Sequence, residues 1–305
     1  MQAFLQVTLG GLVTGSLYGL FALGIALIYR TTGVLNFAYG AMAAFSACFL
    51  YVLLTGPRLT FWLALLLCLV FAAVFGALLE RLFARPLLDA PVFTKAIATL
   101  ALALVLRTVA QAIWPQLAST QHFPTPFEGH AIVIGGVYIS AAHIATLVAA
   151  ALVVVALTLF LNRTRLGVAM RATADNQPVA RLMGVPVGLV FLLTWELSAG
   201  VGALTAVLVA SQQGLINITY MDPVLILAFV AAVLGGLDSL PGALLGGVLV
   251  GLVENWLSLL LAGHHLGALD IGAPGVRETL IFAAFVVALL LRPQGLLGKA
   301  QLRRV

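Results

Sequence analysis

The stretch Gly15–Met42, GSLYGLFALGIALIYRTTGVLNFAYGAM, decides the fold class of this chain. Its apolar residues run on without the residue-by-residue alternation that marks a strand of a transmembrane barrel. Since only helices and closed barrels satisfy every backbone polar group in lipid, such a run indicates a membrane helix. Arg30 and the following Thr-Thr-Gly interrupt it before a second apolar run begins. The stretch therefore predicts two helices joined by a break.

The composition extends this interpretation to the whole chain of 305 residues. Hydrophobic residues make up 63% and charged residues 8%, and the mean hydropathy is +1.16. One soluble core could not bury that much apolar surface. We expect an all-α, polytopic membrane bundle of about eight or nine transmembrane helices with broken or re-entrant segments. It would form a single domain over residues 1–305, with spans near residues 4–28, 34–54, 60–79, 96–113, 140–161, 190–210, 223–236, 242–261 and 277–291.

Lysine and arginine residues set the expected orientation, because those in short loops stay on the cytoplasmic side. With the N-terminus outside, most of the 15 basic residues fall in inner loops. We therefore expect a multi-pass membrane protein with a cytoplasmic C-terminus. The pI of about 9.6 reflects this topology and does not indicate nucleic-acid binding. The inner basic residues are Arg30, Arg81, Arg85, Lys95, Arg163, Arg165, Arg171, Arg181, Arg292, Lys299, Arg303 and Arg304.

The longest inner loop, residues 162–187, reads NRTRLGVAMRATADNQPVARLMGVPV and carries its own helix signals. Asp175 is a good N-cap, and Pro178 is tolerated in a first helical turn. Gly184 can close the helix in the left-handed conformation, and Pro186 prevents its continuation. The loop therefore predicts a helix of about two turns.

The apolar residues of this short helix share one face. Val179, Leu182 and Met183 follow i, i+3, i+4 spacing, while Arg181 stays polar. A helix so short is marginal alone, so something must support it. Two interpretations remain open: a basic loop that lies on anionic headgroups, or a docking element for a cytoplasmic partner.

The segment RATADNQPVARLMGV, residues 171–185, resembles the coupling loop of permease subunits in the branched-chain amino-acid ABC importer family, specifically the H-type. Residues 15–42, the segment AAVLGGLDSLPGALLGGVLVGLVEN from Ala231, and the ending LRPQGLLG from Leu291 agree with it. The resemblance implies an inner-membrane permease that pairs with an M-type permease subunit, two cytoplasmic ATP-binding subunits and a periplasmic binding protein. The family transports leucine, isoleucine and valine most typically, and relatives carry other amino acids, amides or urea. It also implies that the short helix inserts into an ATPase groove, with Asp175, Pro178, Val179, Arg181, Leu182, Met183 and Gly184 as the coupling residues.

The chain carries no ATP site of its own. A P-loop requires Gly-x-x-x-x-Gly-Lys-Ser/Thr, whereas Gly298-Lys299 is followed by Ala300 and has Pro293 in place of the first glycine. No metal-ligand spacing exists among the cysteines and histidines, and no span carries a convergent catalytic cluster. We therefore predict neither an enzyme nor a cofactor or metal site, and any ATPase would be another chain.

Two interrupted segments could shape a translocation pathway. Adjacent glycines, a serine and a proline break the apolar run near Gly235, and the polar break near Asn36 has the same character. Non-helical backbone at membrane depth is tolerated only in a protein interior or beside a water-filled cavity. We expect the pathway to be lined or hinged by Asn36, Tyr39, Gly235, Gly236, Ser239 and Pro241.

Glycines that recur every four residues predict close helix packing. They form two groups, Gly11, Gly15 and Gly19 near the N-terminus, and Gly242, Gly246, Gly247 and Gly251.

The outer loop, residues 114–140, contains three prolines and no lysine or arginine. Its end, AIVIGGVYIS, predicts a hairpin around Gly135-Gly136. This hairpin could carry a binding protein or merely cap the ends of the spans.

Arg107 lies inside a predicted span, where a charge needs a partner or must snorkel. Glu196 and Glu254 are the intramembrane carboxylates considered, and only Glu254 matches the depth of Arg107. We predict an Arg107–Glu254 ion pair; the alternative is that Arg107 snorkels and Glu254 is protonated. An ion-coupled secondary transporter or a passive channel for small amino acids or amides remains the alternative function.

Overall fold

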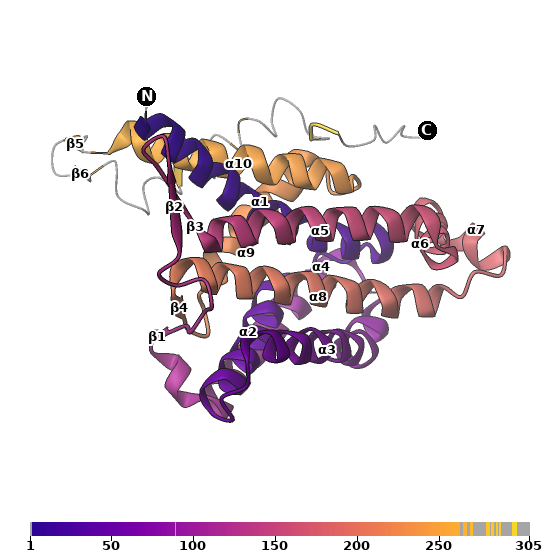
Figure 1. Cartoon of the computed structure of the whole chain (residues 1–305). Helices are drawn as coiled ribbons and strands as arrows, with labels where there is room; N and C mark the ends of the chain where they lie inside the picture. Colours follow the sequence, from indigo (N-terminus) through magenta and orange to yellow (C-terminus); the bar gives the residue numbers. More distant parts are fainter. Residues whose placement is uncertain are drawn as a thin grey trace.

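The computed structural model describes residues 2–88, 90–262, 265–266, 269–270, 279–280, 282–283, 285, 287 and 295–297. The described chain is mainly helical, with its long helices side by side (Figure 1). The helices are α1 (Gln2–Thr32), α2 (Tyr39–Thr55), α3 (Phe61–Leu79), η1 (Glu80–Ala84), η2 (Arg85–Leu87), α4 (Val92–Ile113), η3 (Pro115–Ala118), α5 (Ala141–Arg163), α6 (Arg165–Asp175), α7 (Gln177–Leu182), α8 (Val187–Gln213), α9 (Asp222–Gly235) and α10 (Leu240–Leu261). The short strands are β1 (Gln121–His122), β2 (Ala131–Ile134), β3 (Val137–Ser140), β4 (Leu215–Ile216), β5 (His265–Leu266) and β6 (Leu269–Asp270).

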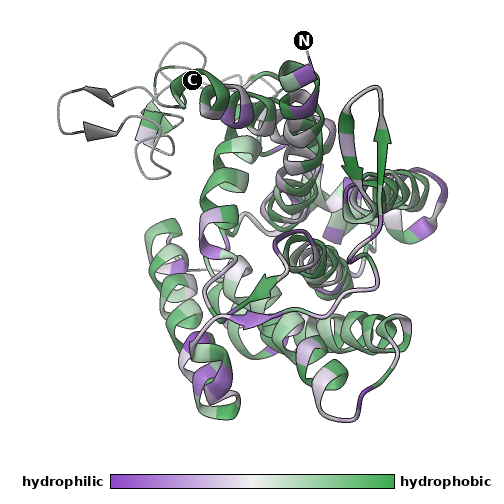
Figure 2. Ribbon diagram, turned by 60° about the vertical axis from the view of Figure 1, so that its left-hand side comes forward, coloured by the Kyte–Doolittle hydropathy of each residue, from purple (hydrophilic) through white to green (hydrophobic). Residues whose placement is uncertain are grey.

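Six helices of the described chain are long and apolar enough to cross a membrane. They are α1, α3 with its η1–η2 extension, α4, α5, α8 and α10. Most of the residues in the helices are hydrophobic, as the green ribbon shows (Figure 2). The helices α2 and α9 are also apolar but have only 17 and 14 residues. The expectation of an all-helical, polytopic membrane protein is therefore confirmed. The predicted last span, residues 277–291, lies mostly outside the described residues.

The helix α1 is central to the bundle. In its most apolar 18-residue window 83% of the residues are buried, against 22–28% in α3, α4, α5 and α10. Its first turns lie at the end of the bundle that carries the β2–β3 hairpin, and its last residues lie near α6. We call these the hairpin end and the α7 end, at the left and right of Figure 1.

Glycines let α1 and α10 meet backbone to backbone, as predicted. A methyl group on Gly247 would overlap the Cα of Gly19, and one on Gly251 would overlap the Cα of Gly15. The same device joins α9 to α10, because a methyl group on Gly246 would overlap the carbonyl oxygen of Ala231. Such close approach maximises van der Waals contact between helices in lipid, where the hydrophobic effect between helices is weak.

The helix break between α1 and α2 is fixed by hydrogen bonds to its exposed backbone groups. Gly33 has φ of 67°, the left-handed conformation that ends α1. The hydroxyl of Thr99 in α4 accepts from the Phe37 N–H at 3.2 Å and donates to the Leu35 carbonyl at 3.2 Å. Non-helical backbone is therefore satisfied inside the protein, as it must be at membrane depth.

The hairpin predicted around Gly135-Gly136 is confirmed. Strands β2 and β3 pair antiparallel with Ile134 opposite Val137, and both glycines have positive φ, 60° and 82°. A two-residue turn of this kind matches the twist of the strands. The Gln6 side chain accepts from the Tyr138 N–H at 2.7 Å and donates to the Tyr138 carbonyl at 2.9 Å, so α1 holds the hairpin in place.

Candidate functional site

The basic loop between α5 and α8 contains two helices where the sequence predicts one. Thr164 caps α6, since its hydroxyl accepts from the Gly167 N–H at 3.0 Å. Asn176 caps α7, since its side-chain oxygen accepts from the Val179 N–H at 3.1 Å. The prediction of Asp175 as the N-cap is therefore wrong. Asp175 instead ends α6, and its carboxylate lies 3.7 Å from the Arg30 guanidinium.

The end of α7 follows the prediction. Pro178 lies in the first turn. Gly184 has φ of 82°, and its N–H donates to the Arg181 carbonyl at 3.0 Å. The Val185 N–H donates to the Ala180 carbonyl, also at 3.0 Å. This pair of bonds is a Schellman closure, and it gives a six-residue helix a fixed end.

The helix α7 packs on α8 through one buried residue, whereas its large apolar side chains are exposed to solvent. Ala180 is 3% exposed and packs against Val187 and Phe191 at the start of α8. Leu182 is 86% exposed and Met183 is 79% exposed, at the end of α7. The helix α7 itself lies at the far right of Figure 1. We call Val179, Leu182 and Met183 the α7 tip. The packing supplies the support that so short a helix needs.

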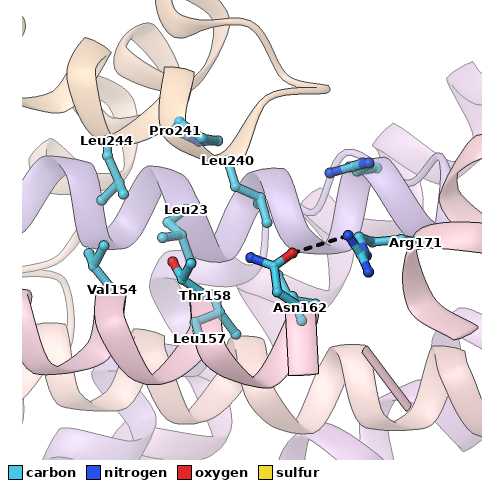
Figure 3. A pocket seen from close by; sticks show the side chains of 11 residues that line it. Leu23, Val154, Leu157, Thr158, Asn162, Arg171, Leu240, Pro241 and Leu244 are labelled. Atoms are coloured by element: carbon cyan, nitrogen blue, oxygen red, sulfur yellow. Dashed lines mark hydrogen bonds between the residues drawn. The ribbon is translucent and has the colours of Figure 1, made fainter. Parts of the chain in front are cut away.

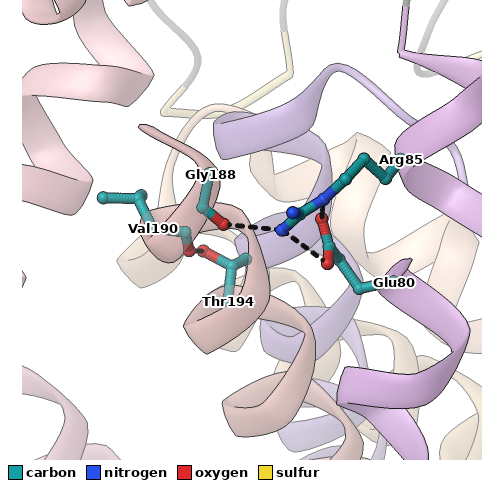
Figure 4. Close-up of polar contacts among 5 residues, drawn as sticks. All are labelled: Glu80, Arg85, Gly188, Val190 and Thr194. Atoms are coloured by element: carbon teal, nitrogen blue, oxygen red, sulfur yellow. Dashed lines mark hydrogen bonds and ion pairs between the residues drawn. The ribbon is translucent and has the colours of Figure 1, made fainter. Parts of the chain in front are cut away.

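Arg85 joins the end of α3 to the start of α8 through an ion pair with Glu80 and a hydrogen bond to Gly188 (Figure 4). The Arg85 guanidinium donates to both carboxylate oxygens of Glu80 at 2.9 Å, and also to the Gly188 carbonyl at 3.0 Å. The Glu80 side chain is 1% exposed, whereas that of Arg85 is 44% exposed. The start of α8, on which α7 packs, is therefore itself held to the end of α3. Sequence reasoning missed this pair because it treated Arg85 only as a topology signal; a carboxylate at the end of an apolar span was the available clue.

The residues predicted to line a pathway divide between two places. Asn36 and Tyr39 are 1% and 0% exposed, inside the packed helix break. The ring of Tyr39 fills the space beside Gly24 and Gly202, where a methyl group would overlap it. These two side chains therefore shape the break and line no described cavity.

The other predicted pathway residues form the turn between α9 and α10. Gly236 has φ of 102°, and the Ser239 hydroxyl accepts from the Gly242 N–H at 3.1 Å, which caps α10. Gly235 packs directly on Gly242. The backbone N–H groups of Leu296 and Leu297 donate to the Leu234 and Gly235 carbonyls at 2.7 and 3.1 Å, so a C-terminal segment satisfies the end of α9.

Pro241 borders a groove of about 400 Å³ between α1, α5 and α10 (Figure 3). Leucine and valine side chains form its walls, and Arg30, Asn162 and Arg171 stand at the α7 end of it. Of the six predicted pathway residues, Pro241 alone contributes to this groove.

The predicted Arg107–Glu254 ion pair is wrong. The Arg107 guanidinium lies 2.6 Å from the carboxylate of Asp222, the first residue of α9. Glu254 accepts a hydrogen bond from the Tyr18 hydroxyl at 2.7 Å. The depth comparison failed because it considered only Glu196 and Glu254 and left out Asp222, which directly precedes the predicted span 223–236. In the structure the short α9 begins where Arg107 can reach its first carboxylate.

The fold and the α6–α7 loop define a multi-pass, all-helical membrane protein with an exposed apolar tip at one end. Residues 7–292 match the family described as "Branched-chain amino acid transport system / permease component", and the chain belongs to this family. The resemblance drawn from the sequence motifs is therefore confirmed, and the chain is of the LivH type.

Two relatives and one solved structure illustrate the similarity. The permease protein BraD of the high-affinity branched-chain amino acid transport system of Pseudomonas aeruginosa is 31% identical, over 99% of this chain and 98% of its own. LivH of the corresponding Escherichia coli K12 system is 28% identical over the same shares. A chain of PsaBC from Streptococcus pneumoniae, solved in complex with Fab, has a TM-score of 0.49 at 16% identity, over 95% of this chain and 92% of that one.

Proposed function

We propose that this chain is the transmembrane permease subunit of an ATP-driven ABC importer for branched-chain amino acids or similar small polar solutes. It takes substrate from a periplasmic binding protein and works with an M-type permease subunit and two cytoplasmic ATP-binding subunits. It forms one permease domain over residues 1–305 in the bacterial inner membrane. The α7 end and the C-terminus face the cytoplasm, and eight or nine segments cross the bilayer, about as many as the apolar runs allow.

The observation that best supports this proposal is the exposed α7 tip. Leu182 and Met183 are largely exposed in a loop that is otherwise rich in arginine, beyond the ends of the apolar helices. Two large apolar side chains held outward by a fixed helix end suit a hydrophobic groove on a partner protein, as helix-in-groove recognition requires. The coupling residues are Asp175, Pro178, Val179, Arg181, Leu182, Met183 and Gly184, with Asp175 acting through Arg30 rather than as a cap.

ATP hydrolysis belongs to the partner chains, because this sequence lacks a P-loop. The chain itself performs no catalysis and needs no cofactor or metal. Its relatives are named as transport permeases.

The translocation pathway runs beside the two helix breaks. Asn36 and Tyr39 hold the first break, and Gly235, Gly236, Ser239 and Pro241 form the second. Both sets act as hinges: small rotations at a broken helix move the segments on either side of it without loss of internal hydrogen bonds.

The test is the double substitution Leu182→Asp/Met183→Asp in the assembled importer. We expect uptake to stop and ATP hydrolysis to become insensitive to the loaded binding protein, with membrane insertion unchanged. The matched control is Leu182→Met/Met183→Leu, which keeps the tip apolar and should keep uptake.

Uptake by the aspartate variant at the unsubstituted rate would exclude the tip as the coupling element. Separately, the purified chain without partners should hydrolyse ATP no faster than the background, and hydrolysis that persists without partners would contradict the assignment of ATPase activity to other chains.

A further inference from the structure

We infer that the groove between α1, α5 and α10 binds an anionic phospholipid. Its phosphate lies between Arg30 and Arg171, and one acyl chain follows α5 toward the middle of the bundle. This site does not depend on the proposed coupling role of α7.

The α7 end of the groove is built to receive an anion. Arg30 comes from the last turn of α1 and Arg171 from α6, and both line the groove. Arg171 is labelled in Figure 3. Arg171 donates to the Asn162 side-chain oxygen at 3.1 Å. Its Nε is buried and has no hydrogen-bond partner among the described residues. A buried guanidinium donor is costly to leave unpaired, and a phosphate oxygen is the acceptor that suits it.

The nearby acidic group does not neutralise this end. The Asp175 carboxylate lies 3.7 Å from Arg30, and its side chain is 62% exposed. The residues that line the groove include these two arginines and no carboxylate, so a net positive charge remains for a phosphate. Basic pockets between membrane helices on the cytoplasmic side are typical sites for anionic headgroups.

The rest of the groove is apolar apart from Thr158 and extends along α5. Val154 and Leu157 of α5 lie across it from Leu23 of α1 and Leu244 of α10 (Figure 3), and Leu161 of α5 also lines it. From Asn162 to Val154 the helix rises about 12 Å at 1.5 Å per residue. One leaflet of the hydrocarbon core is about 15 Å deep. The polar end of the groove thus suits the headgroup of a phospholipid, and its apolar walls suit an acyl chain over about the depth of one leaflet.

The position of Arg171 gives such a lipid a structural role. Arg171 belongs to α6, which leads directly into α7. A phosphate bound to Arg171 and Arg30 would join α6 to α1 at the membrane surface, so the lipid would set the height of the α6–α7 loop above the bilayer.

Native mass spectrometry of the purified protein in detergent tests this inference with added phosphatidylglycerol and, in parallel, phosphatidylcholine. We expect the intact protein to retain one phosphatidylglycerol and no phosphatidylcholine. Arg171→Gln should lower the retained fraction about fivefold, the effect of roughly one surface cation on an anionic lipid. Arg171→Lys should retain the lipid. Leu157→Trp, which fills the groove and leaves both arginines in place, should lower retention as strongly.

Two control variants make the same kinds of substitution at positions outside the groove. Arg165→Gln removes an exposed charge from α6, and Leu152→Trp enlarges an exposed residue of α5. Equal loss in Arg165→Gln would assign retention to the basic surface as a whole and overturn the site. Equal retention of phosphatidylcholine would do the same. If Leu157→Trp retains the lipid but stops uptake, the groove is a solute path and not a lipid site. Elution as a single symmetric peak in gel filtration identifies the variants that are folded, and Arg30→Gln replaces Arg171→Gln if the latter is not.

Discussion

The hydroxyl of Tyr39 donates a 2.7 Å hydrogen bond to the backbone carbonyl of Ser198. The Ser198 hydroxyl in turn donates to the Gly24 carbonyl at 2.8 Å. The first residue of α2 is thereby joined to the middle of α8, and α8 to α1, at the point where the membrane helix is broken. Two side-chain hydrogen bonds therefore connect α1, α2 and α8.

The first prediction concerns this junction. Gly202→Ala should destabilise the protein by about 1–3 kcal/mol, because a methyl group there would lie 2.9 Å from the Tyr39 ring and force repacking. Tyr39→Phe should cost about 1 kcal/mol, the typical contribution of one hydrogen bond. Denaturant unfolding in detergent measures both effects.

Gly200→Ala is the matched control on the same helix, since a methyl group there would meet nothing within 4 Å. It should be neutral or stabilise α8 by up to about 1 kcal/mol. If the two alanine variants unfold alike, tight packing around Tyr39 does not hold the break.

A second prediction follows from the pairing of Arg107 with Asp222. Arg107→Asp should impair folding or uptake, because it places two carboxylates together in a partly buried site. The exchange Arg107→Asp/Asp222→Arg should recover part of the loss, since the pair is restored in reverse. Arg107→Glu/Glu254→Arg should recover none, because Glu254 bonds to Tyr18. Yield of folded protein and uptake are measured across each double-mutant cycle, and equal recovery in both would refute the assignment.

The third prediction is an asymmetry within the Glu80–Arg85 pair. Arg85→Gln leaves a carboxylate that is 1% exposed without its cation, and breaking a buried pair in this way costs up to about 3–5 kcal/mol. Glu80→Gln leaves an arginine that is 44% exposed and can be hydrated, so it should cost clearly less. Arg81→Gln, at an exposed neighbouring position, should have little effect. The melting temperatures in detergent rank the three variants. If Glu80→Gln lowers the melting temperature more than Arg85→Gln does, the buried carboxylate does not depend on its arginine partner.

Side-specific labelling provides the fourth prediction. Ser119→Cys at the hairpin end should react with an impermeant maleimide in intact spheroplasts, and Ala172→Cys in α6 should react only after permeabilisation. Both positions are exposed. Cys48 and Cys68 are 0% exposed and are replaced in this background. Labelling of Ala172→Cys in intact spheroplasts would invert the proposed orientation.

The sequence predicted the helices well because their cause is local. Runs of apolar residues between basic loops fix where each span lies, and the glycine spacing of α1 and α10 fixes which faces meet. The cap of α7 was misplaced by one residue because aspartate and asparagine are nearly equal N-caps, and Asp175 and Asn176 are adjacent. A cap preference alone cannot choose between them; the preceding α6, which sequence reasoning did not foresee, ends on Asp175 and settles the choice.

Polar pairs inside the bundle were beyond the reach of sequence alone. The partner of Arg107 depends on the depth at which α9 begins, and that depth is set by the non-helical segment before it. The Glu80–Arg85 contact depends on a turn of π-helix at the end of α3. Both are consequences of tertiary geometry, which hydropathy does not encode. The α7 tip was foreseen because its exposed face and its glycine closure are both local.

The length of α9 has a consequence for how the chain enters the bilayer during synthesis. Its 14 residues cover about 21 Å, against a hydrocarbon core of about 30 Å, and its first residue is a carboxylate. Such a segment is a poor substrate for insertion by itself. Gly235 on Gly242 and Gly246 on Ala231 join it backbone to backbone with α10, which is long enough to span. We therefore expect stable insertion of α9 to wait until α10 has left the ribosome, so that the two helices enter the membrane as a hairpin.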